Sequence, residues 1–125
     1  MTPNQFSTAV NALEKEKMEA LILDLRDNGG GLLKSAVSML DRVMSKGMVV
    51  YTKDKQGVSE KFYAEDVKHV SVPMAVLVNG NSASASEVFS GALQDKKKAK
   101  LIGTKTFGKG IVQTIFDLQD GSALK

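Results

Sequence analysis

The stretch Ala20-Leu21-Ile22-Leu23-Asp24-Leu25-Arg26-Asp27-Asn28-Gly29-Gly30-Gly31 joins an apolar run directly to three glycines. The apolar run is too short for most helices, and its nearly continuous apolar character is typical of a buried strand in a parallel sheet. The apolar residues that recur at helical spacing after the glycines and before Gly47 are Leu32, Leu33, Ala36, Val37, Leu40, Val43 and Met44. The stretch therefore predicts a strand, a glycine loop and a helix.

The same order occurs a second time further along the chain. Residues 74–79 are predicted to form another buried strand, the polar loop 80–82 follows, and a helix is predicted from about Ala85 to Lys96. Parallel strands linked by helices indicate an α/β domain. Because such domains place their ligands at the carboxyl ends of the strands, the loops 28–31 and 79–84 are expected to face one crevice.

The remaining predicted elements complete one domain. A helix over 3–17 begins with the capping-box pattern Thr2-Pro3-Asn4-Gln5. The other elements, in chain order, are strands over 48–52 and 58–63 around the turn 54–57, a strand over 100–103, a loop over 104–110, a strand over 111–118 and a turn over 119–121. With 125 residues, 42% of them hydrophobic, the chain has the composition of one globular domain, which we assign to residues 1–125.

The composition excludes several kinds of site. The chain has no cysteine, so a thiol nucleophile, a disulfide and a thiolate metal site are excluded. Its single histidine, His69, cannot build a His-rich metal site. A Ser-His-Asp triad that uses His69 stays open, although we interpret 67–70 as the polar face of a short strand.

Charge and hydropathy favour neither a nucleic-acid partner nor a membrane span. The net charge is +3, and the basic cluster 96–100 follows a predicted helix, where cations suit the negative end of the helix dipole. We interpret this cluster as a solvated helix end, because a nucleic-acid patch would need more charge or interleaved aromatic residues. The chain has no run of about 18 apolar residues and no signal-peptide pattern at its start.

Ser84 allows two interpretations. The pattern Ser84-Ala85-Ser86-Glu87 is a capping box, in which the serine begins the helix that follows. The same position would place the hydroxyl where helix amides and the helix dipole stabilise a developing oxyanion, with the Ala85 amide as the first donor. A second donor could come from the loop 29–31, where glycines let the backbone approach closely; alternatively, the glycines only form a sharp turn.

Lys109 is the best candidate for the base that a serine nucleophile needs. With His69 discounted, the base must be Lys, Asp or Glu, and a buried lysine can lower its pKa toward about 7 to 8. Glycines flank Lys109 on both sides, and the apolar residues around it are Phe107, Ile111 and Val112. The alternative is a solvated loop lysine.

Residues 103–109 also match the first seven positions of a nucleotide-binding P-loop. A P-loop continues with Ser or Thr and then a helix, whereas Gly110 comes next here and a strand is predicted to follow. A nucleotide-binding function would require a helix directly after Lys109.

Three blocks of the sequence resemble the carboxyl-terminal processing peptidases, or tail-specific proteases, which are serine peptidases with a Ser/Lys pair. The blocks, in the family's order, are residues 20–33, 76–95 and 103–124. They contain Leu-Asp-Leu-Arg-Asp-Asn-Gly-Gly-Gly, then Ser-Ala-Ser-Ala-Ser-Glu, then Thr-Phe-Gly-Lys-Gly-Ile-Val-Gln-Thr. The resemblance implies the crotonase-like or Clp-protease-like α/β core that the family shares.

The resemblance also assigns roles to individual residues. It implies that Ser84 is the nucleophile, Lys109 the general base and Gln113 the residue that orients the lysine. The oxyanion donors would be the amides of Ala85 and Gly30. No cofactor and no metal are expected. On a straight strand, Lys109 and Gln113 would lie about 13 Å apart, so a bend at Gly110 or a later start of that strand is expected.

Substrates and location are implied by the resemblance alone. The expected substrates are proteins or peptides cut near apolar C-terminal tails, and the parent protein is expected outside the cytoplasm (periplasm, cell envelope or lumen), with membrane association and oligomeric state left open. Gly29 stands where the family usually has proline, which loosens the loop. No PDZ domain fits in 125 residues, so we expect a piece of a longer protein. The alternative function is a catalytically inactive domain that binds a peptide or a partner.

Overall fold

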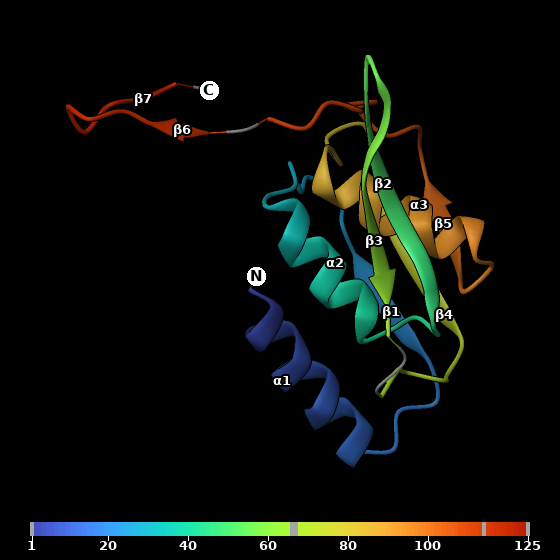
Figure 1. The fold of residues 1–125 in the computed structure, drawn as a ribbon. Coiled ribbons are helices and arrows are strands. Elements are labelled where there is room, and N and C mark those ends of the chain that lie inside the picture. The colour runs from blue at the N-terminus through green and yellow to red at the C-terminus, as the bar shows by residue number, and fades with distance from the viewer. Residues whose placement is uncertain (1, 66–67, 114, 125) are drawn as a thin grey trace.

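The computed structural model describes residues 2–65, 68–113 and 115–124 (Figure 1). Its elements, in chain order, are α1 (Pro3–Lys15), β1 (Leu21–Asp24), α2 (Leu33–Asp41), β2 (Gly47–Asp54), β3 (Gly57–Ala64), β4 (Met74–Val78), α3 (Ala85–Asp95), β5 (Ala99–Gly103), β6 (Phe116–Asp117) and β7 (Ala123–Leu124). The predicted strand-loop-helix order therefore occurs twice, in β1–α2 and in β4–α3.

A three-stranded parallel sheet organises the molecule, with β4 between β1 and β5. Leu23 of β1 pairs with Val76 of β4, which pairs with Leu101 of β5. The predicted α/β architecture with parallel strands and crossover helices is confirmed. The loops after β1 and β4 leave the sheet at the same edge, because parallel strands end on the same side.

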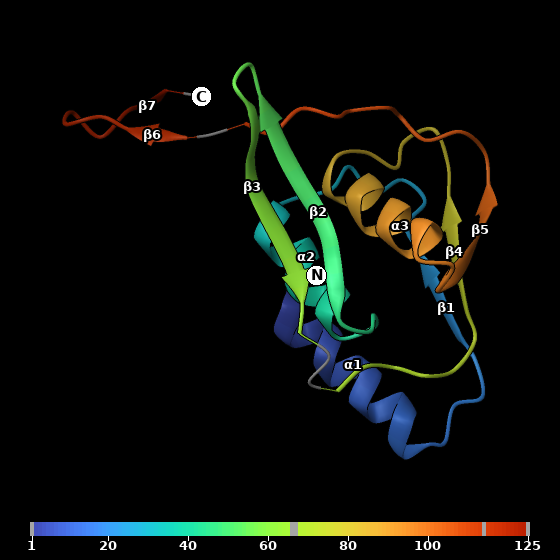
Figure 2. The ribbon, with the colours of Figure 1, turned by 45° about the vertical axis from the view of Figure 1, so that its right-hand side comes forward.

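Helices cover one face of this sheet. Figure 2 shows α3 between the sheet and the antiparallel hairpin of β2 and β3. The side chains of the central core lie between these layers and include the fully buried Leu40, Val43, Val76 and Leu93. Burial of such side chains contributes on the order of 1.5–3 kcal/mol each, so this layer supplies much of the stability.

Helix α1 packs onto the same core through its amphipathic face. Its start has the predicted capping box, in which Gln5 and Thr2 exchange hydrogen bonds. Phe6 and Val10 are buried, and the Phe6 ring meets the Phe89 ring of α3 edge-on, with centroids 6.2 Å apart. Aromatic pairs favour this geometry. Among the described residues, no helix is both long enough and apolar enough to cross a membrane.

The outer face of the sheet differs from the prediction of a strand buried on both sides. Leu21 is buried, but its neighbour Ile22 is 67% exposed, and Ile102 of β5 is 53% exposed. Alternate residues of a strand point to opposite faces. The helices of the described residues cover only one face, so half of the apolar run in β1 faces outward. Leu32, expected on the buried face of the second helix, is also exposed because it precedes α2.

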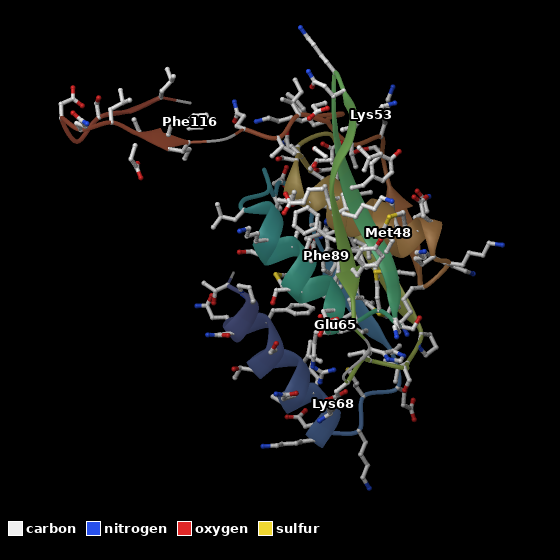
Figure 3. The ribbon with its side chains drawn as sticks, in the orientation of Figure 1. Met48, Lys53, Glu65, Lys68, Phe89 and Phe116 are labelled. Atoms are coloured by element: carbon white, nitrogen blue, oxygen red, sulfur yellow. The ribbon has the colours of Figure 1, made fainter. Side chains whose placement is uncertain are left out.

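The prediction of a strand over 111–118 is wrong for most of its length. Residues 111–113 and 115 are not in a strand, and position 114 lies outside the described residues. Only Phe116–Asp117 forms a strand, and Phe116 pairs with Leu124 of β7. Figure 1 shows this segment projecting from the body, and Figure 3 places Phe116 on it, away from Phe89. Apolar and β-branched residues form a strand only where they have a partner strand and a surface to cover.

The interpretation of 67–70 as a strand is wrong for residues 68–70, and Val67 lies outside the described residues. Here the chain is held by α2 and by the basic cluster. The Val70 amide donates to the Arg42 carbonyl at 3.0 Å, and the Lys98 ammonium donates to the Val70 carbonyl at 2.6 Å. The predicted solvated cluster is therefore confirmed for the exposed Lys96, Lys97 and Lys100, whereas Lys98 is half-buried and burial lowers its pKa.

Candidate active site

The loops after β1 and β4 are joined by a network of hydrogen bonds. The Asp27 carboxylate accepts from the side-chain amides of Asn81 at 2.8 Å and Asn79 at 3.0 Å, and the Asp27 amide donates to the Asn79 side chain at 3.0 Å. The hydrogen bonds from Asn81 and Asn79 lower the pKa of Asp27. The Ala83 amide donates to the Asn28 carbonyl at 3.1 Å. The two loops therefore lie together at the carboxyl end of the sheet, as predicted, and are joined by these hydrogen bonds.

A buried hydroxyl secures the second loop. Ser82 is fully buried, and its hydroxyl donates to the Leu25 carbonyl at 2.6 Å while it accepts from the Asn79 amide at 3.0 Å. A buried hydroxyl with both partners satisfied fixes the backbone around it. The backbone position from which the Ser84 turn starts is therefore fixed.

Ser84 begins helix α3 in a strained conformation. It is the N-cap residue, and its φ of 55° and ψ of −119° lie outside the extended region that N-cap residues usually occupy. A non-glycine residue held in such a region costs about 1–3 kcal/mol, and this strain clusters at functional sites. The Ser84 side chain is half-buried. The predicted helix start is confirmed, and a helix cap alone does not require this conformation.

Gly30 lies directly against this turn. A Cβ atom at Gly30 would sit 2.5 Å from the Ala83 carbonyl oxygen and 2.7 Å from the Ala85 nitrogen, and the φ of Gly30 is +93°. The two residues predicted to form the oxyanion hole, Gly30 and Ala85, are therefore neighbours. In this structure the Gly30 amide donates to the Asn28 side-chain oxygen at 3.0 Å, and the Ser86 hydroxyl donates to the same oxygen at 2.9 Å.

Lys109 lies in the connection that follows β5, with an exposed side chain. Its backbone amide reaches the start of α3, where it donates to the Glu87 carboxylate at 2.9 Å. No hydrogen bond joins the Lys109 ammonium to the Ser84 hydroxyl, although both residues are described. Gln113 is exposed further along the same connection. Residues 110–113 form no helix, so the P-loop interpretation is wrong.

Glu87 makes contacts at this site that no sequence pattern predicts. Its carboxylate accepts three backbone amides, from Ser84 at 2.8 Å, Gly108 at 2.6 Å and Lys109 at 2.9 Å. Burial raises the pKa of Glu87, but hydrogen bonds from the Thr106 side chain and these amides outweigh it, so the pKa is lowered. The capping-box pattern predicts a glutamate here that accepts one backbone amide, that of Ser84. Nothing in the sequence indicates that this glutamate accepts two more amides from a distant loop.

A groove of about 610 Å³ opens beside Gly30 of the glycine loop and Ala85 at the start of α3. It runs between α1, α2 and β1, and the large apolar side chains that line it include Phe6, Leu13, Leu23, Leu32, Met39 and Phe89. Its volume lies within the range of about 300–1,000 Å³ that is typical of ligand sites.

His69 lies near the opposite end of β4 from this site. His69 precedes β4, whereas Ser84 follows the other end of that strand. A strand of this length separates its ends by roughly 15 Å, so a Ser84–His69 pair is not formed. The described residues contain no group of three His, Cys, Asp or Glu side chains that could hold a metal ion.

The comparison with known proteins identifies the family of the chain. The family model described as peptidase family S41 matches residues 1–125. The chain belongs to peptidase family S41. The resemblance of its three motif blocks to the carboxyl-terminal processing peptidases is confirmed by relatives that carry this name.

Two such S41 relatives are more than 40% identical to the chain. The carboxyl-terminal-processing protease of Synechocystis sp. is 43% identical over 116 residues, which cover 93% of this chain and 27% of the relative. The chloroplastic C-terminal processing peptidase of Tetradesmus obliquus is 42% identical over 118 residues, which cover 93% of this chain and 25% of the relative.

A solved S41 structure has the same fold. The photosystem II D1 C-terminal processing protease is 40% identical, with a TM-score of 0.86 over 96% of this chain and 32% of that one. The expected crotonase-like or Clp-protease-like core is confirmed, and the family is one of serine-type peptidases. The chain spans between a quarter and a third of the length of these relatives.

Proposed function

We propose that residues 1–125 are the peptidase core of a C-terminal processing serine endopeptidase, in which Ser84 and Lys109 form the catalytic pair. The observation that carries the proposal is the single carboxylate of Glu87, which binds the backbone amides of both Ser84 and Lys109. Two segments that are distant in the sequence thus meet at the start of one helix. Family membership supplies the reaction class, and the geometry supports the choice of residues.

Peptide cleavage assigns one task to each residue. The Ser84 oxygen attacks the carbonyl carbon of the scissile bond while the neutral amine of Lys109 accepts the hydroxyl proton. The proton then passes to the departing amine, which leaves an ester between Ser84 and the substrate. Water, deprotonated by the same lysine, hydrolyses that ester and restores the serine. Gln113 orients the lysine amine through its side-chain amide.

The negative oxygen of the tetrahedral intermediate needs amide donors. The Ala85 amide belongs to the first turn of α3, where helix amides have no partner within the helix. The Gly30 amide is the second proposed donor. It must break its hydrogen bond to the Asn28 side chain before it can donate to the negative oxygen. Lys109 likewise has to bring its amine to the Ser84 hydroxyl. We therefore propose that substrate binding rearranges both the glycine loop and the lysine side chain.

The apolar groove supports a preference for apolar tails. It contains Gly30 and Ala85 in its lining, so a peptide bond held at these residues places its neighbouring side chain at the groove. Leu32 is 74% exposed beside it and offers an apolar contact. Each buried methylene of the substrate contributes about 0.8 kcal/mol. We propose an extracytoplasmic or lumenal location, which fits the name of the chloroplastic relative.

The experiment that tests the catalytic pair uses the full-length protein and a test protein with an apolar C-terminal tail. Ser84→Ala and Lys109→Ala are each expected to reduce kcat by about 10³-fold or more, as the loss of a nucleophile or its base does. The matched control is Ser45→Ala, which changes an exposed serine outside the loops 28–31 and 79–84. Unchanged cleavage by Ser84→Ala would contradict the proposal. A test protein with a charged tail should be cleaved more slowly.

A second candidate function is binding of a peptide or partner without turnover. It is favoured by the exposed Lys109 side chain and by its lack of a hydrogen bond to the Ser84 hydroxyl in this structure. This function predicts that an apolar peptide binds in the groove and stays intact in the full-length protein. Leu32→Asp would weaken that binding, whereas Ser84→Ala would leave it unchanged.

A further inference from the structure

The Glu87 carboxylate joins two segments that the chain separates by more than twenty residues. Its Oε2 accepts the amides of Ser84 at 2.8 Å and Lys109 at 2.9 Å, and its Oε1 accepts the amide of Gly108 at 2.6 Å. Hydrogen bonds to an ionised carboxylate are shorter and about twice as strong as those between neutral groups. Both oxygens of this side chain therefore accept hydrogen bonds. They bind one amide at the nucleophile turn, which carries Ser84, and two amides of the connection after β5 (residues 104–113), which we call the lysine loop.

A second capping box in the same chain shows what a helix cap alone requires. At the start of α1, the Gln5 side chain accepts the Thr2 amide at 2.9 Å, which completes that cap. Glu87 does the same for Ser84 and additionally binds Gly108 and Lys109. An ionised carboxylate only accepts hydrogen bonds, whereas glutamine would turn an NH₂ donor toward one of these amides. The site therefore uses the charge of glutamate and not merely its shape.

The lysine loop has few other attachments. The Phe107 amide donates to the Ser82 carbonyl at 3.0 Å, while Gly108, Lys109 and the residues up to 113 are exposed and lie outside any strand. A loop without a ladder of backbone hydrogen bonds samples many conformations unless side chains hold it. The bonds to Glu87 thus set where the backbone of Lys109 lies relative to Ser84.

We propose that Glu87 is a positioning residue, which clamps the lysine loop onto the nucleophile turn so that Lys109 starts each catalytic cycle within reach of Ser84. This inference rests on the proposed Ser84/Lys109 mechanism. Glu87 binds the backbone amides of Ser84, Gly108 and Lys109 and, in the same connection, the Thr106 side chain. It therefore contributes to the rate through the placement of Lys109 and not through contact with the substrate.

The test combines hydrogen exchange with kinetics on the full-length protein and its Glu87→Gln variant. The amides of Gly108 and Lys109 are expected to exchange at least about tenfold faster in the variant, because each loses a charge-assisted hydrogen bond that opposes opening of the loop. The amide of Leu93, inside α3, should keep its protection. The kcat for an apolar-tailed protein should fall at least about tenfold, with KM changed less than about twofold.

Two further variants separate positioning from folding. Glu87→Asp keeps the charge on a shorter side chain and should recover part of the lost kcat. Gln5→Ala removes the corresponding cap of α1, and it should lower the melting temperature without changing kcat.

Each outcome decides the proposal. Faster exchange at Gly108 and Lys109 together with a lower kcat supports it. Unchanged exchange of both amides in Glu87→Gln overturns the clamp, and faster exchange with an unchanged kcat overturns its role in positioning. If Ser84→Ala itself remains active, the proposed mechanism fails, and this result is distinguishable because the exchange measurement does not depend on catalysis.

Discussion

Gly30 is the residue where a single methyl group would meet the backbone of the nucleophile turn. An added Cβ would lie 2.5 Å from the Ala83 oxygen and 2.7 Å from the Ala85 nitrogen, at a φ of +93°. Gly30→Ala is therefore expected to destabilise the domain by about 2–5 kcal/mol, through backbone strain and overpacking. Chemical denaturation measures this loss.

The matched control for Gly30→Ala is the neighbouring Gly29→Ala. A Cβ at Gly29 meets no atom within 4 Å. The control should change the free energy of unfolding by less than about 1 kcal/mol. Equal losses in the two variants would show that Gly30 does not pack against the Ser84 turn as the structure describes.

The carboxylate of Asp24 at the end of β1 reports on its pairing with Arg26. The guanidinium of Arg26 donates to both carboxylate oxygens, at 3.0 Å from Nε and 2.7 Å from Nη2, and holds the pKa of Asp24 at about 2 instead of 3.8. Since the folded-state pKa is lowered, the stability that this pair contributes is present above pH 3.8 and is lost as the pH falls toward about 2. Both side chains are largely solvated, so the contribution is small.

An NMR titration of the Asp24 carboxyl group tests this pairing. Arg26→Gln should return the titration midpoint of Asp24 toward 3.8, while Lys46→Gln, which removes an exposed charge elsewhere, should leave it unchanged. A midpoint that stays near 2 in Arg26→Gln would assign the low pKa to another cause.

For individual residues, the sequence predicted which loops meet at the candidate site but not all of their contacts. The Ser-x-x-Glu pattern and the glycine loop were sufficient to place Ser84, Ala85 and Gly30 together, because both loops follow parallel strands. The additional bonds of Glu87 could not be predicted, since they depend on a loop more than twenty residues away. The bond between the Gly30 amide and Asn28 likewise depends on local backbone geometry that no pattern specifies.

Among the elements, α1 is joined to the end of α2 by the side chain of Arg42, in addition to its buried apolar contacts. Arg42 donates to the Glu14 carboxylate at 2.5 Å, to the Asn11 side chain at 2.9 Å and to the Lys68 carbonyl at 2.9 Å, and its side chain is only 11% exposed. Arg42→Ala should reduce the free energy of unfolding by about 1–3 kcal/mol, because these partners lose a charged donor. Thermal and denaturant unfolding measure the loss.

The control for Arg42→Ala is Lys34→Ala, which removes an exposed charge from the same helix. It should alter the free energy of unfolding by less than about 0.5 kcal/mol. If both variants are equally stable, Arg42 does not anchor α1. Wild-type stability in Arg42→Ala would lead to the same conclusion.

Helices and strands with a strong period were predictable, whereas elements that depend on a distant partner were not. The amphipathic faces of α1 and α3 and the hairpin of β2 and β3 follow from periodicity and turn residues alone. Ile111 and Val112 are residue types that favour strands, but the described chain offers them no adjacent strand. Periodicity also could not show that one face of β1 would remain open, because it does not report what packs on a sheet.

Across the whole molecule, stability and the candidate site both depend on the part of the chain that packs around β4. Every buried hydrophobic residue lies between Phe6 and Leu93 among the described positions. The segment after β5 reaches the site through its early residues: Phe107 binds Ser82 in the loop before α3, and Gly108 and Lys109 bind Glu87 in the first turn of α3. The buried core and the segment after β5 are therefore separate along the chain, because every buried hydrophobic residue of the described positions precedes that segment.

This separation predicts that removal of residues 116–125 leaves the core folded. Phe116, Leu118 and Leu124 are 59%, 49% and 62% exposed, and β6 pairs with β7 rather than with the body. Because these apolar side chains bury little surface, the deletion should change the free energy of unfolding by less than about 1 kcal/mol. Removal of residues 2–17 should instead unfold the domain, since α1 supplies the buried Phe6 and Val10. Denaturant unfolding of the two truncated chains measures both effects, and a large loss from the first deletion would mean that the C-terminal segment packs on the body in solution.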